Sequence, residues 1–325
     1  MTTTLASASH ALSAGHDLSP PGADAPVFLD RAATAHATPY RALVDALALA
    51  ATQYQQGLIH SPTRTGVPLA GDGVSLSMPA SAADISIHKL ANVQPANSAS
   101  TLPTIHGLVT VSDAQTGRPL CFLDGPEITG RRTAALSMLG LEKLRTTPVR
   151  NVLLIGTGTQ AIYHVQALAA LHPRCRIYVR GKSLENELKF CQRQQSVHAQ
   201  MEACPAEIPA DIDTVITVTT SLTPVYDLPA QAHRLVIGVG AFMPSMAEIG
   251  ASTLLGSRIY VDDLGAAKAE AGDLLQAGID WSQVQAIGQV QHTPAAQPMV
   301  YKTVGSAAWD LAAARVALQS LRKHS

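Results

Sequence analysis

Hydrophobic and polar positions follow one period in residues 37–50 and another in residues 61–124. The first segment has apolar side chains at helical spacing, with Leu43, Ala46 and Leu47 on one stripe, which predicts a helix. The second holds short apolar runs separated by Gly, Pro, Asn and Asp, the pattern of strands joined by turns. We expect an α+β unit with an antiparallel sheet, whose strands are residues 74–78, 85–90, 107–112 and 120–123, with a hairpin turn at 113–117.

From residue 129 onward the pattern changes to alternating helices and strands. Thr129 is a good N-cap residue, so a helix is expected to begin there and to carry Arg132 in its first turn. Strands alternating with helices predict a parallel sheet with right-handed crossovers, which is a Rossmann-type, doubly wound α/β fold. The expected strands are 151–155, 176–179, 214–218, 235–239 and 258–261, and the expected helices are 160–171, 184–194 and an amphipathic last helix at 306–321.

The length of 325 residues is enough for two domains with their own cores. We predict that residues 1–26, rich in Ala, Ser, Thr, Gly and Pro, form a flexible extension. Residues 27–128 together with 304–325 are expected to form the α+β domain, and residues 129–303 the Rossmann domain.

Composition disfavours nucleic acids, membranes and metal ions as partners. A formal net charge of -1 and an aromatic content of 4% disfavour a nucleic-acid surface. No apolar run reaches the roughly 18–20 residues that a membrane span requires. The four cysteines form no CxxC pair and no zinc spacing, which predicts reduced thiols, a cytoplasmic protein and no metal site.

The strongest local motif lies between the strand at 151–155 and the helix that follows it. There the chain reads Gly156-x-Gly158-x-x-Ala161, with Thr159 and Gln160 before the alanine. In a dinucleotide-binding loop the first glycine permits a tight turn and the second lets the backbone approach a pyrophosphate. The third, small residue lets helix and strand pack closely, and the helix N-terminus faces the phosphates. The alternative is a tight turn without a nucleotide, but the flanking strand and helix favour dinucleotide binding.

The residues after the second strand of this unit bear on the choice of coenzyme. An NAD enzyme usually has Asp or Glu there to hold the ribose hydroxyls. Here we find Arg180, Lys182 and Ser183 in place of an acid, which suit a 2′-phosphate. The alternative is an ordinary solvated basic turn. We therefore predict NADPH as the coenzyme, with NADH possible.

Seven separated segments form a further pattern: PTRT at 62–65, IHKL at 87–90, LDGPEITGRRTAA at 123–135, GTGTQA at 156–161, TVTTSLTP at 217–224, VGA at 239–241 and KTVGSAAWD at 302–310. Together these segments resemble the ornithine cyclodeaminase/mu-crystallin family. The resemblance implies an NAD(P)-binding Rossmann domain, a substrate and dimerisation domain made from both chain ends, a homodimer, and action on α-amino or α-imino acids.

By position, Arg64, Lys89 and Arg132 match the substrate-site cations of the family. A guanidinium can bind the carboxylate of an α-imino acid through two parallel N–H bonds. Lys89 follows apolar neighbours in a predicted strand, so we expect a lowered pKa and either a catalytic proton donor or a second carboxylate anchor. We also expect Arg132, Thr219 and Val239 to contact the coenzyme. For Asp310 we expect helix capping rather than contact with the cleft, and we assign no role to His88 or His106.

One difference from the cyclodeaminases guides the functional hypothesis. Where those enzymes have Gly-Gly-Asp, this chain reads GAFMP at 240–244, so Phe242 replaces the carboxylate that takes part in deamination. The resemblance then points to the reductases of cyclic ketimines, which convert Δ1-pyrroline-2-carboxylate to L-proline and Δ1-piperideine-2-carboxylate to L-pipecolate in hydroxyproline or lysine breakdown. A cyclodeaminase, an amino-acid dehydrogenase and a non-catalytic NADPH-dependent binding protein remain alternatives, and the preferred ring size stays open.

Overall fold

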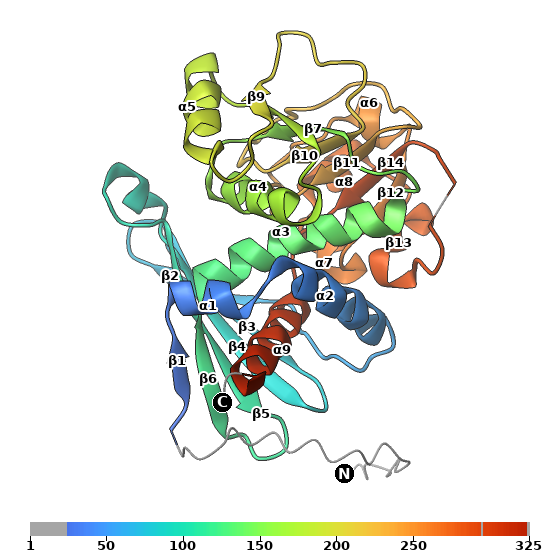
Figure 1. The fold of residues 1–325 in the computed structure, drawn as a ribbon. Helices are drawn as coiled ribbons and strands as arrows, with labels where there is room; N and C mark the ends of the chain where they lie inside the picture. The colour runs from blue at the N-terminus through green and yellow to red at the C-terminus, as the bar shows by residue number, and fades with distance from the viewer. Residues whose placement is uncertain (1–24, 294, 324–325) are drawn as a thin grey trace.

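The computed structural model describes residues 25–293 and 295–323, so the predicted extension lies almost entirely outside the described residues. Figure 1 shows a sheet at each end of the molecule with helices between them. The first sheet has the strand order β1-β6-β5-β4-β3-β2. Neighbouring strands are antiparallel as expected, except that β1 adds in parallel to β6. Its strands are β1 Val27–Leu29, β2 Thr65–Leu69, β3 Gly73–Ser81, β4 Ile85–Val93, β5 Ile105–Asp113 and β6 Pro119–Asp124.

Helices from both ends of the chain cover one face of this sheet. α9 (Ala307–Lys323) packs on β3 and β4, and α3 (Gly125–Leu144) packs on β4 and β5. α1 (Arg31–Ala37) packs on β6, and α2 (Tyr40–Gln55) lies over α3 and α9. Because side chains of a strand alternate between faces, Lys89 points to the helix-covered face together with Ile87 and is buried, whereas His88 and Leu90 are exposed.

The second sheet is entirely parallel, which confirms the Rossmann-type prediction. Its order is β13-β12-β14-β11-β10-β7-β8-β9. The hydrophobic pattern did not indicate β9, β13 or β14, although β14 is an interior strand between β11 and β12. The strands are β7 Asn151–Ile155, β8 Arg176–Arg180, β9 Met201–Ala203, β10 Thr214–Thr217, β11 Leu235–Gly238, β12 Arg258–Val261, β13 Gln285–Ala286 and β14 Met299–Lys302. The helices of this half are α4 Thr159–Leu171, α5 Leu184–Gln194, α6 Ala251–Leu254, α7 Leu264–Glu270 and α8 Gly272–Ala277.

The predicted start of α3 at Thr129 is wrong by one turn. The helix begins at Gly125, and the carboxylate of Asp124 accepts the N–H of Glu127 at 2.7 Å as its N-cap. Pro126 follows in the first turn, where the missing N–H costs nothing. Asp and Thr both cap helices well, and here the earlier residue does so. Arg132 therefore lies in the second turn of α3, and the predicted domain boundary after residue 128 falls inside a continuous helix.

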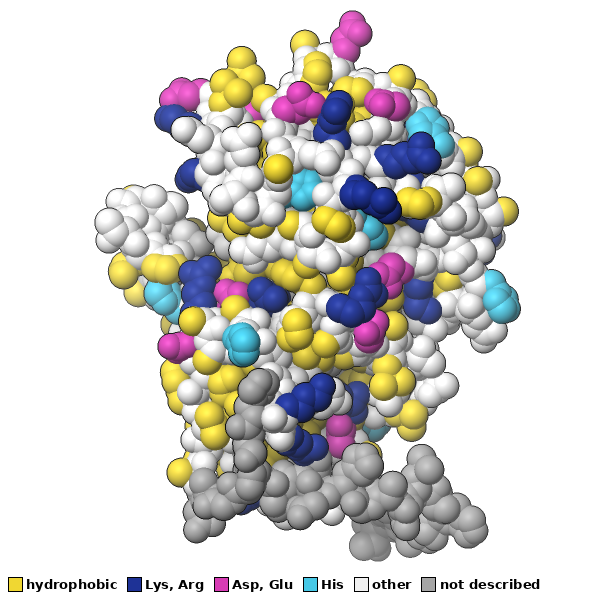
Figure 2. Space-filling model, viewed as in Figure 1, with side chains coloured by type: hydrophobic (Ala, Val, Ile, Leu, Met, Phe, Trp, Pro, Cys, Tyr) yellow, Lys and Arg dark blue, Asp and Glu magenta, His cyan; other side chains and the backbone are white. Residues whose placement is uncertain are grey.

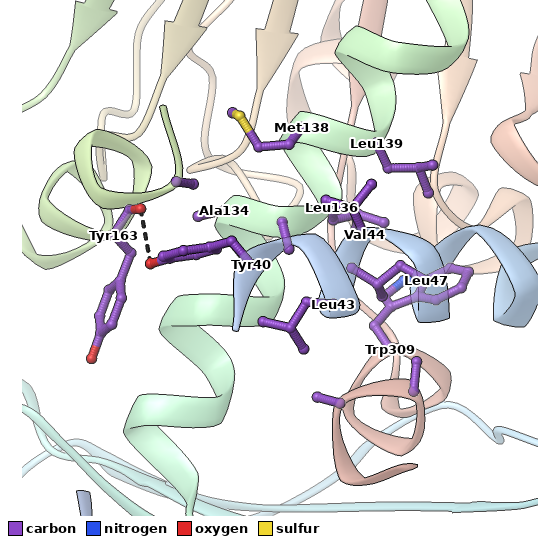
Figure 3. Packing of buried hydrophobic residues seen from close by; sticks show 14 of the residues in the cluster. Tyr40, Leu43, Val44, Leu47, Ala134, Leu136, Met138, Leu139, Tyr163 and Trp309 are labelled. Atoms are coloured by element: carbon purple, nitrogen blue, oxygen red, sulfur yellow. Dashed lines mark hydrogen bonds between the residues drawn. The ribbon is translucent and has the colours of Figure 1, made fainter. Parts of the chain in front are cut away.

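A single apolar cluster extends from the first sheet into the Rossmann half. Figure 3 shows Leu43, Val44 and Leu47 of α2 packed against side chains of α3 and near Trp309 of α9. The edge of the Trp309 ring meets Tyr54, with ring centroids 5.9 Å apart. This continuous core fixes α3 and α9 relative to both sheets.

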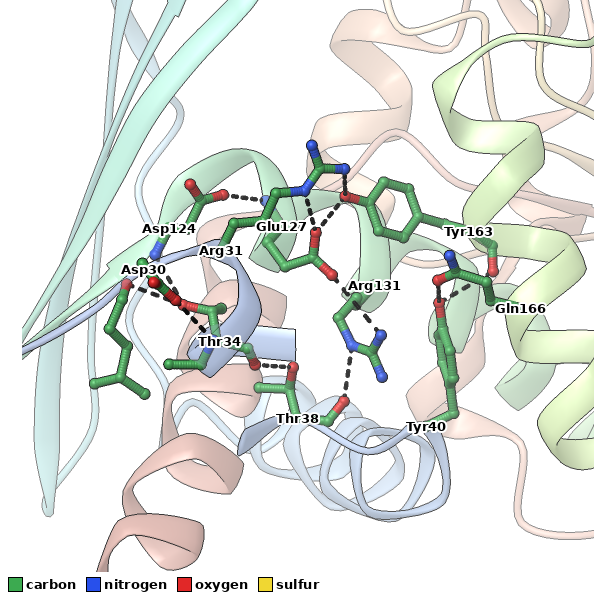
Figure 4. Close-up of polar contacts among 12 residues, drawn as sticks. Asp30, Arg31, Thr34, Thr38, Tyr40, Asp124, Glu127, Arg131, Tyr163 and Gln166 are labelled. Atoms are coloured by element: carbon green, nitrogen blue, oxygen red, sulfur yellow. Dashed lines mark hydrogen bonds and ion pairs between the residues drawn. The ribbon is translucent and has the colours of Figure 1, made fainter. Parts of the chain in front are cut away.

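Polar contacts also join α1 to the helix of the Rossmann phosphate loop. The hydroxyl of Tyr163 on α4 donates to the buried carboxylate of Glu127 at 2.6 Å, and Arg31 donates to the same carboxylate at 3.1 Å (Figure 4). The hydroxyl of Tyr40 donates to the carbonyl of Tyr163 at 3.2 Å. These bonds hold the start of α4 against the first domain.

On the face in Figure 2, cationic side chains are interspersed with acidic ones. All four cysteines are free and buried. Among the described residues, no helix is long and apolar enough to cross a membrane, and no three His, Cys, Asp or Glu side chains are arranged to hold a metal ion.

Candidate active site

The glycine-rich loop has the geometry that a dinucleotide requires. Gly156 adopts φ +126°, and a Cβ there would lie 2.8 Å from the carbonyl oxygen of Val218. Gly158 is the N-cap of α4 and makes no side-chain cap, so the first-turn N–H groups face outward. A Cβ on Gly158 would have nothing within 4 Å, which leaves room for a pyrophosphate. Ala161 is buried against the sheet, and Thr159 and Gln160 begin the helix.

Arg180 is the last residue of β8, where the adenosine part of the coenzyme is expected, and its side chain is bound to the neighbouring loop. Its guanidinium donates to Cys204 Sγ at 3.1 Å and to the carbonyls of Pro205 and Ala206. Ser183 is occupied as the N-cap of α5, and Lys182 is exposed. An acidic side chain does lie at the end of β8, although it comes from α5 and not from the residues directly after the strand. Glu187, buried on α5, accepts the N–H of Gly181 at 2.9 Å, a position that only the fold brings to the strand end.

The other predicted coenzyme contacts lie on neighbouring strands at the same edge. Thr219 follows β10 and Val239 follows β11, and these two strands pair in register beside β7. In an open parallel sheet, ligands bind in the crevice outside the carboxyl ends of the strands. The fold therefore brings together the phosphate loop, Thr219 and Val239.

Two of the predicted substrate cations meet on one carboxylate. Lys89 Nζ lies 2.7 Å from Asp310 Oδ2, and Arg132 Nε donates to Asp310 Oδ1 at 3.1 Å. Lys89 also donates to the hydroxyl of Thr129 at 3.4 Å. The expectation that Asp310 caps α9 is therefore wrong. Its side chain pairs with the cations, and the hydroxyl of Ser306 instead accepts an N–H at the start of the helix.

Burial sets the electrostatics of this triad. Loss of water around the ammonium is the largest effect and lowers the pKa of Lys89 to about 8, although the carboxylate of Asp310 partly offsets it. Burial alone would raise the pKa of Asp310, but the charges of Lys89 and Arg132 outweigh it and hold that pKa below its ordinary value. Lys89 can therefore lose a proton near neutral pH while Asp310 stays ionised.

Arg64 stands apart from that triad. Its guanidinium binds both carboxylate oxygens of Glu270 on α7, with Nε to Oε1 at 2.9 Å, and also reaches the carbonyl of Val304 at 3.5 Å. The structure thus does not bring all three cations onto one anion. Glu270 belongs to no motif in the sequence, so only the fold identifies it.

A cavity of about 100 Å³ lies beside the ion pair of Arg64 and Glu270, and both side chains line it. It lies between Met78 of β3, the loop at 61–64, α7 and the loop at 305–307. Arg132 does not line the cavity itself, but its guanidinium adjoins the lining residue Gly305, where an added Cβ would lie 3.0 Å from Nη1 and 3.1 Å from Nη2. Its polar lining side chains are Tyr54, Ser61, Thr63, Arg64, Asp263, Glu270 and Ser306.

A second buried carboxylate shapes the wall beside Arg132. Asp262 accepts the N–H groups of Val304 at 3.1 Å and Gly305 at 2.9 Å, and the indole N–H of Trp309 at 3.1 Å. Burial, assisted by the charge of Asp263, raises the pKa of Asp262 to about 6. The loop at 304–305, whose Gly305 lines the cavity, is therefore held in place by the side chain of Asp262, the residue after β12.

A glycine-rich loop of the dinucleotide-binding type at the edge of a Rossmann sheet and the three cations Arg64, Lys89 and Arg132 indicate a class, the nicotinamide-coenzyme oxidoreductases of small anionic substrates. The chain belongs to the ornithine cyclodeaminase/mu-crystallin family, which matches residues 25–325.

Two bacterial relatives resemble the chain over nearly its whole length. It is 49% identical to the Δ1-pyrroline-2-carboxylate reductase 1 of Burkholderia multivorans over 91% of this chain and 96% of the relative. It is 48% identical to the Δ1-pyrroline-2-carboxylate/Δ1-piperideine-2-carboxylate reductase of Azospirillum brasilense, with the same coverage. Among solved structures, the Thermococcus litoralis Δ1-pyrroline-2-carboxylate reductase with NADH and L-proline has a TM-score of 0.81 at 20% identity, covering 92% of this chain and 98% of that one.

Proposed function

We propose that this protein reduces cyclic ketimines with NADPH, converting Δ1-pyrroline-2-carboxylate to L-proline and Δ1-piperideine-2-carboxylate to L-pipecolate. The observation that carries the proposal is the guanidinium of Arg132. Asp310 fixes its Nε, while its two terminal nitrogens lie beside Gly305 at the cavity wall. The proposed domains are residues 27–128 with 304–325 for substrate binding and dimerisation, and residues 129–303 for the dinucleotide, with Arg132 at their boundary contacting the substrate as well. The names of the two bacterial relatives support both substrates.

In this mechanism Arg132 binds the substrate carboxylate through two parallel N–H bonds, and Lys89 adds a further donor. Binding at that end fixes the imine carbon, which lies next to the carboxylate, at the mouth of the coenzyme crevice. The bound coenzyme supplies the hydride that this carbon accepts. Lys89, with a pKa of about 8, provides the proton for the ring nitrogen, directly or through water.

Glu270 gives the cavity a negative group on the wall held by Arg64. A carboxylate there stabilises the positive charge of a protonated imine or of the product amine. Phe242, which is 40% exposed in the loop after β11, offers no carboxylate for deamination. This arrangement favours reduction over ring closure with loss of ammonia.

The direct test mixes the purified protein with Δ1-pyrroline-2-carboxylate and NADPH and follows the loss of nicotinamide absorbance. We expect oxidation of NADPH and formation of L-proline. Absence of oxidation with either cyclic imine and either coenzyme rejects the proposal. Ammonia release from ornithine would then indicate a cyclodeaminase, and coenzyme binding without turnover would indicate a binding protein.

The pH dependence of the reaction is expected to report Lys89. Because its folded pKa is lowered to about 8, the cation is present below pH 8 and is lost above it. We expect kcat/KM for the imine to fall about tenfold per pH unit above that point. In Lys89→Arg, whose guanidinium does not titrate, this alkaline decline should move at least one unit upward; an unchanged decline would assign it to another group.

The preference for NADPH over NADH is proposed to come from Arg180 and Lys182. We expect Lys182→Ala and Arg180→Ala each to raise KM for NADPH about tenfold and to change KM for NADH by less than about twofold. Steady-state kinetics with both coenzymes measure this. Arg176→Ala removes an exposed cation from the other end of β8 and serves as the matched control. An equal effect on both coenzymes would argue for an NADH enzyme.

We propose that the protein is a cytoplasmic homodimer formed through the first sheet. Support comes from the face opposite the helices, where Phe28 is 67% exposed and Leu90 is 40% exposed. The buried, free thiols agree with a reducing compartment. We expect the double variant Phe28→Asp, Leu90→Asp to sediment as a monomer where the wild type sediments as a dimer. A dimer that survives both substitutions would place the interface elsewhere.

A further inference from the structure

The loops after β10 and β11 touch at the edge where the coenzyme is proposed to bind. A Cβ on Gly240 would lie 1.8 Å from the carbonyl oxygen and 2.6 Å from the nitrogen of Thr219. No side chain fits between the two loops at this point. Thr219 and Val239 flank the contact, and both are proposed contacts of the coenzyme, so the relative position of the loops determines the shape of that part of the crevice.

One buried carboxylate, that of Glu248, ties the two loops together. Its Oε1 accepts both the backbone N–H and the hydroxyl of Thr219, the latter at 2.8 Å. Its Oε2 accepts the N–H groups of Gly240 and Ala241, the latter at 3.2 Å. The side chain is fully buried, and its four donors come from two loops that belong to different strands. An ionised carboxylate can accept all four because each of its two oxygens accepts two hydrogen bonds.

Glu248 is itself oriented by a buried ion pair. Asp273 Oδ1 accepts the N–H groups of Glu248 and Ile249, the latter at 2.8 Å. Asp273 Oδ2 lies 2.6 Å from Lys302 Nζ, and both side chains are inaccessible to water. Lys302 ends β14, the strand that pairs with β11. Replacing a buried ion pair by apolar residues often costs nothing in stability, so its presence here fits a role in fixing geometry.

We propose that Glu248, oriented by Asp273 and Lys302, is a positioning residue for hydride transfer. It sets the loops at Thr219 and Gly240 so that the nicotinamide end of the coenzyme faces the substrate cavity. Hydride transfer depends steeply on this alignment, because a displacement of about 1 Å can cost about 100-fold in rate. The inference rests on the proposed coenzyme-dependent reduction, and NADPH oxidation by the wild type is therefore established first.

The test compares the whole coenzyme with a fragment that lacks the nicotinamide. In Glu248→Gln the shape is retained, but the new amide group faces N–H donors of one loop. We expect kcat to fall about 10- to 100-fold and the Kd of NADPH to rise, while the Kd of 2′-phospho-ADP-ribose stays within about twofold. With NADPH deuterated at the transferred position, the isotope effect on kcat should increase.

A matched variant probes the opposite end of the crevice. Glu187→Gln changes another buried carboxylate that accepts a backbone N–H, and there the fragment and NADPH should weaken together. Unchanged kcat in Glu248→Gln, or equal weakening of fragment and coenzyme, overturns the proposal. If Glu248→Gln does not fold, Glu248→Asp keeps the charge but is one methylene too short to reach both loops, and the same two readouts decide.

Discussion

Replacement of Lys89 by methionine is expected to lower kcat/KM for the cyclic imine about 1000-fold. Methionine fills a similar volume but removes the charge that lies 2.7 Å from Asp310. The substrate carboxylate then loses a donor, and the ring nitrogen loses its proton source. The Kd of NADPH, measured by fluorescence titration, should change by less than about twofold, since Lys89 is proposed to contact the substrate and not the coenzyme.

The control for this variant is Lys268→Met, which removes an exposed lysine from α7, the helix that carries Glu270. It should retain the activity of the wild type. Lys89→Arg keeps a cation beside Asp310 and separates two roles of the residue. A large recovery of kcat/KM in the arginine variant would mean that Lys89 acts as a carboxylate anchor, whereas continued loss of kcat supports proton donation. Wild-type kcat/KM in Lys89→Met would contradict both.

Replacement of Gly158 by valine is expected to raise the Kd of NADPH about 100-fold with little change in Tm. Nothing lies within 4 Å of the position that the new Cβ takes, and the backbone at φ -87° and ψ -167° suits an L-residue. The added side chain occupies the space through which the pyrophosphate approaches the N-terminus of α4. The folded protein should therefore form normally and bind the coenzyme poorly.

Gly156→Ala is expected to affect stability instead of coenzyme binding alone, because the backbone conformation at this position requires glycine. At φ +126°, with the carbonyl oxygen of Val218 at 2.8 Å from the added Cβ, alanine is expected to lower the free energy of unfolding by about 1–3 kcal/mol. Thermal and denaturant unfolding of both variants, with coenzyme titration, distinguish the two glycines. Tight NADPH binding by a folded Gly158→Val protein would contradict the proposal that the loop at 156–161 binds the pyrophosphate.

Local features of the chain were predictable because they depend on neighbouring residues. The glycine loop follows from a strand that runs directly into Gly156-x-Gly158-x-x-Ala161. The period-two pattern of 85–90 places Lys89 on the same face as Ile87, and that face is buried. The error at α3 is also local. Asp124 and Thr129 are both suitable caps, and the pattern alone does not decide between them.

The substrate site depended on contacts between distant parts of the chain. Asp310 joins Lys89 and Arg132 although these residues are 178 or more positions away from it, and Glu270 meets Arg64 across 206. The partner of a charged side chain leaves no periodic signal in the sequence, because it is set by the packing of helices and strands. By itself, the sequence determined the family and the Rossmann-type fold, and it predicted the glycine-rich loop and the three cations as site residues. Only the tertiary structure decided which carboxylates hold those cations, since burial and pairing arise when strands and helices that are distant in the sequence pack together.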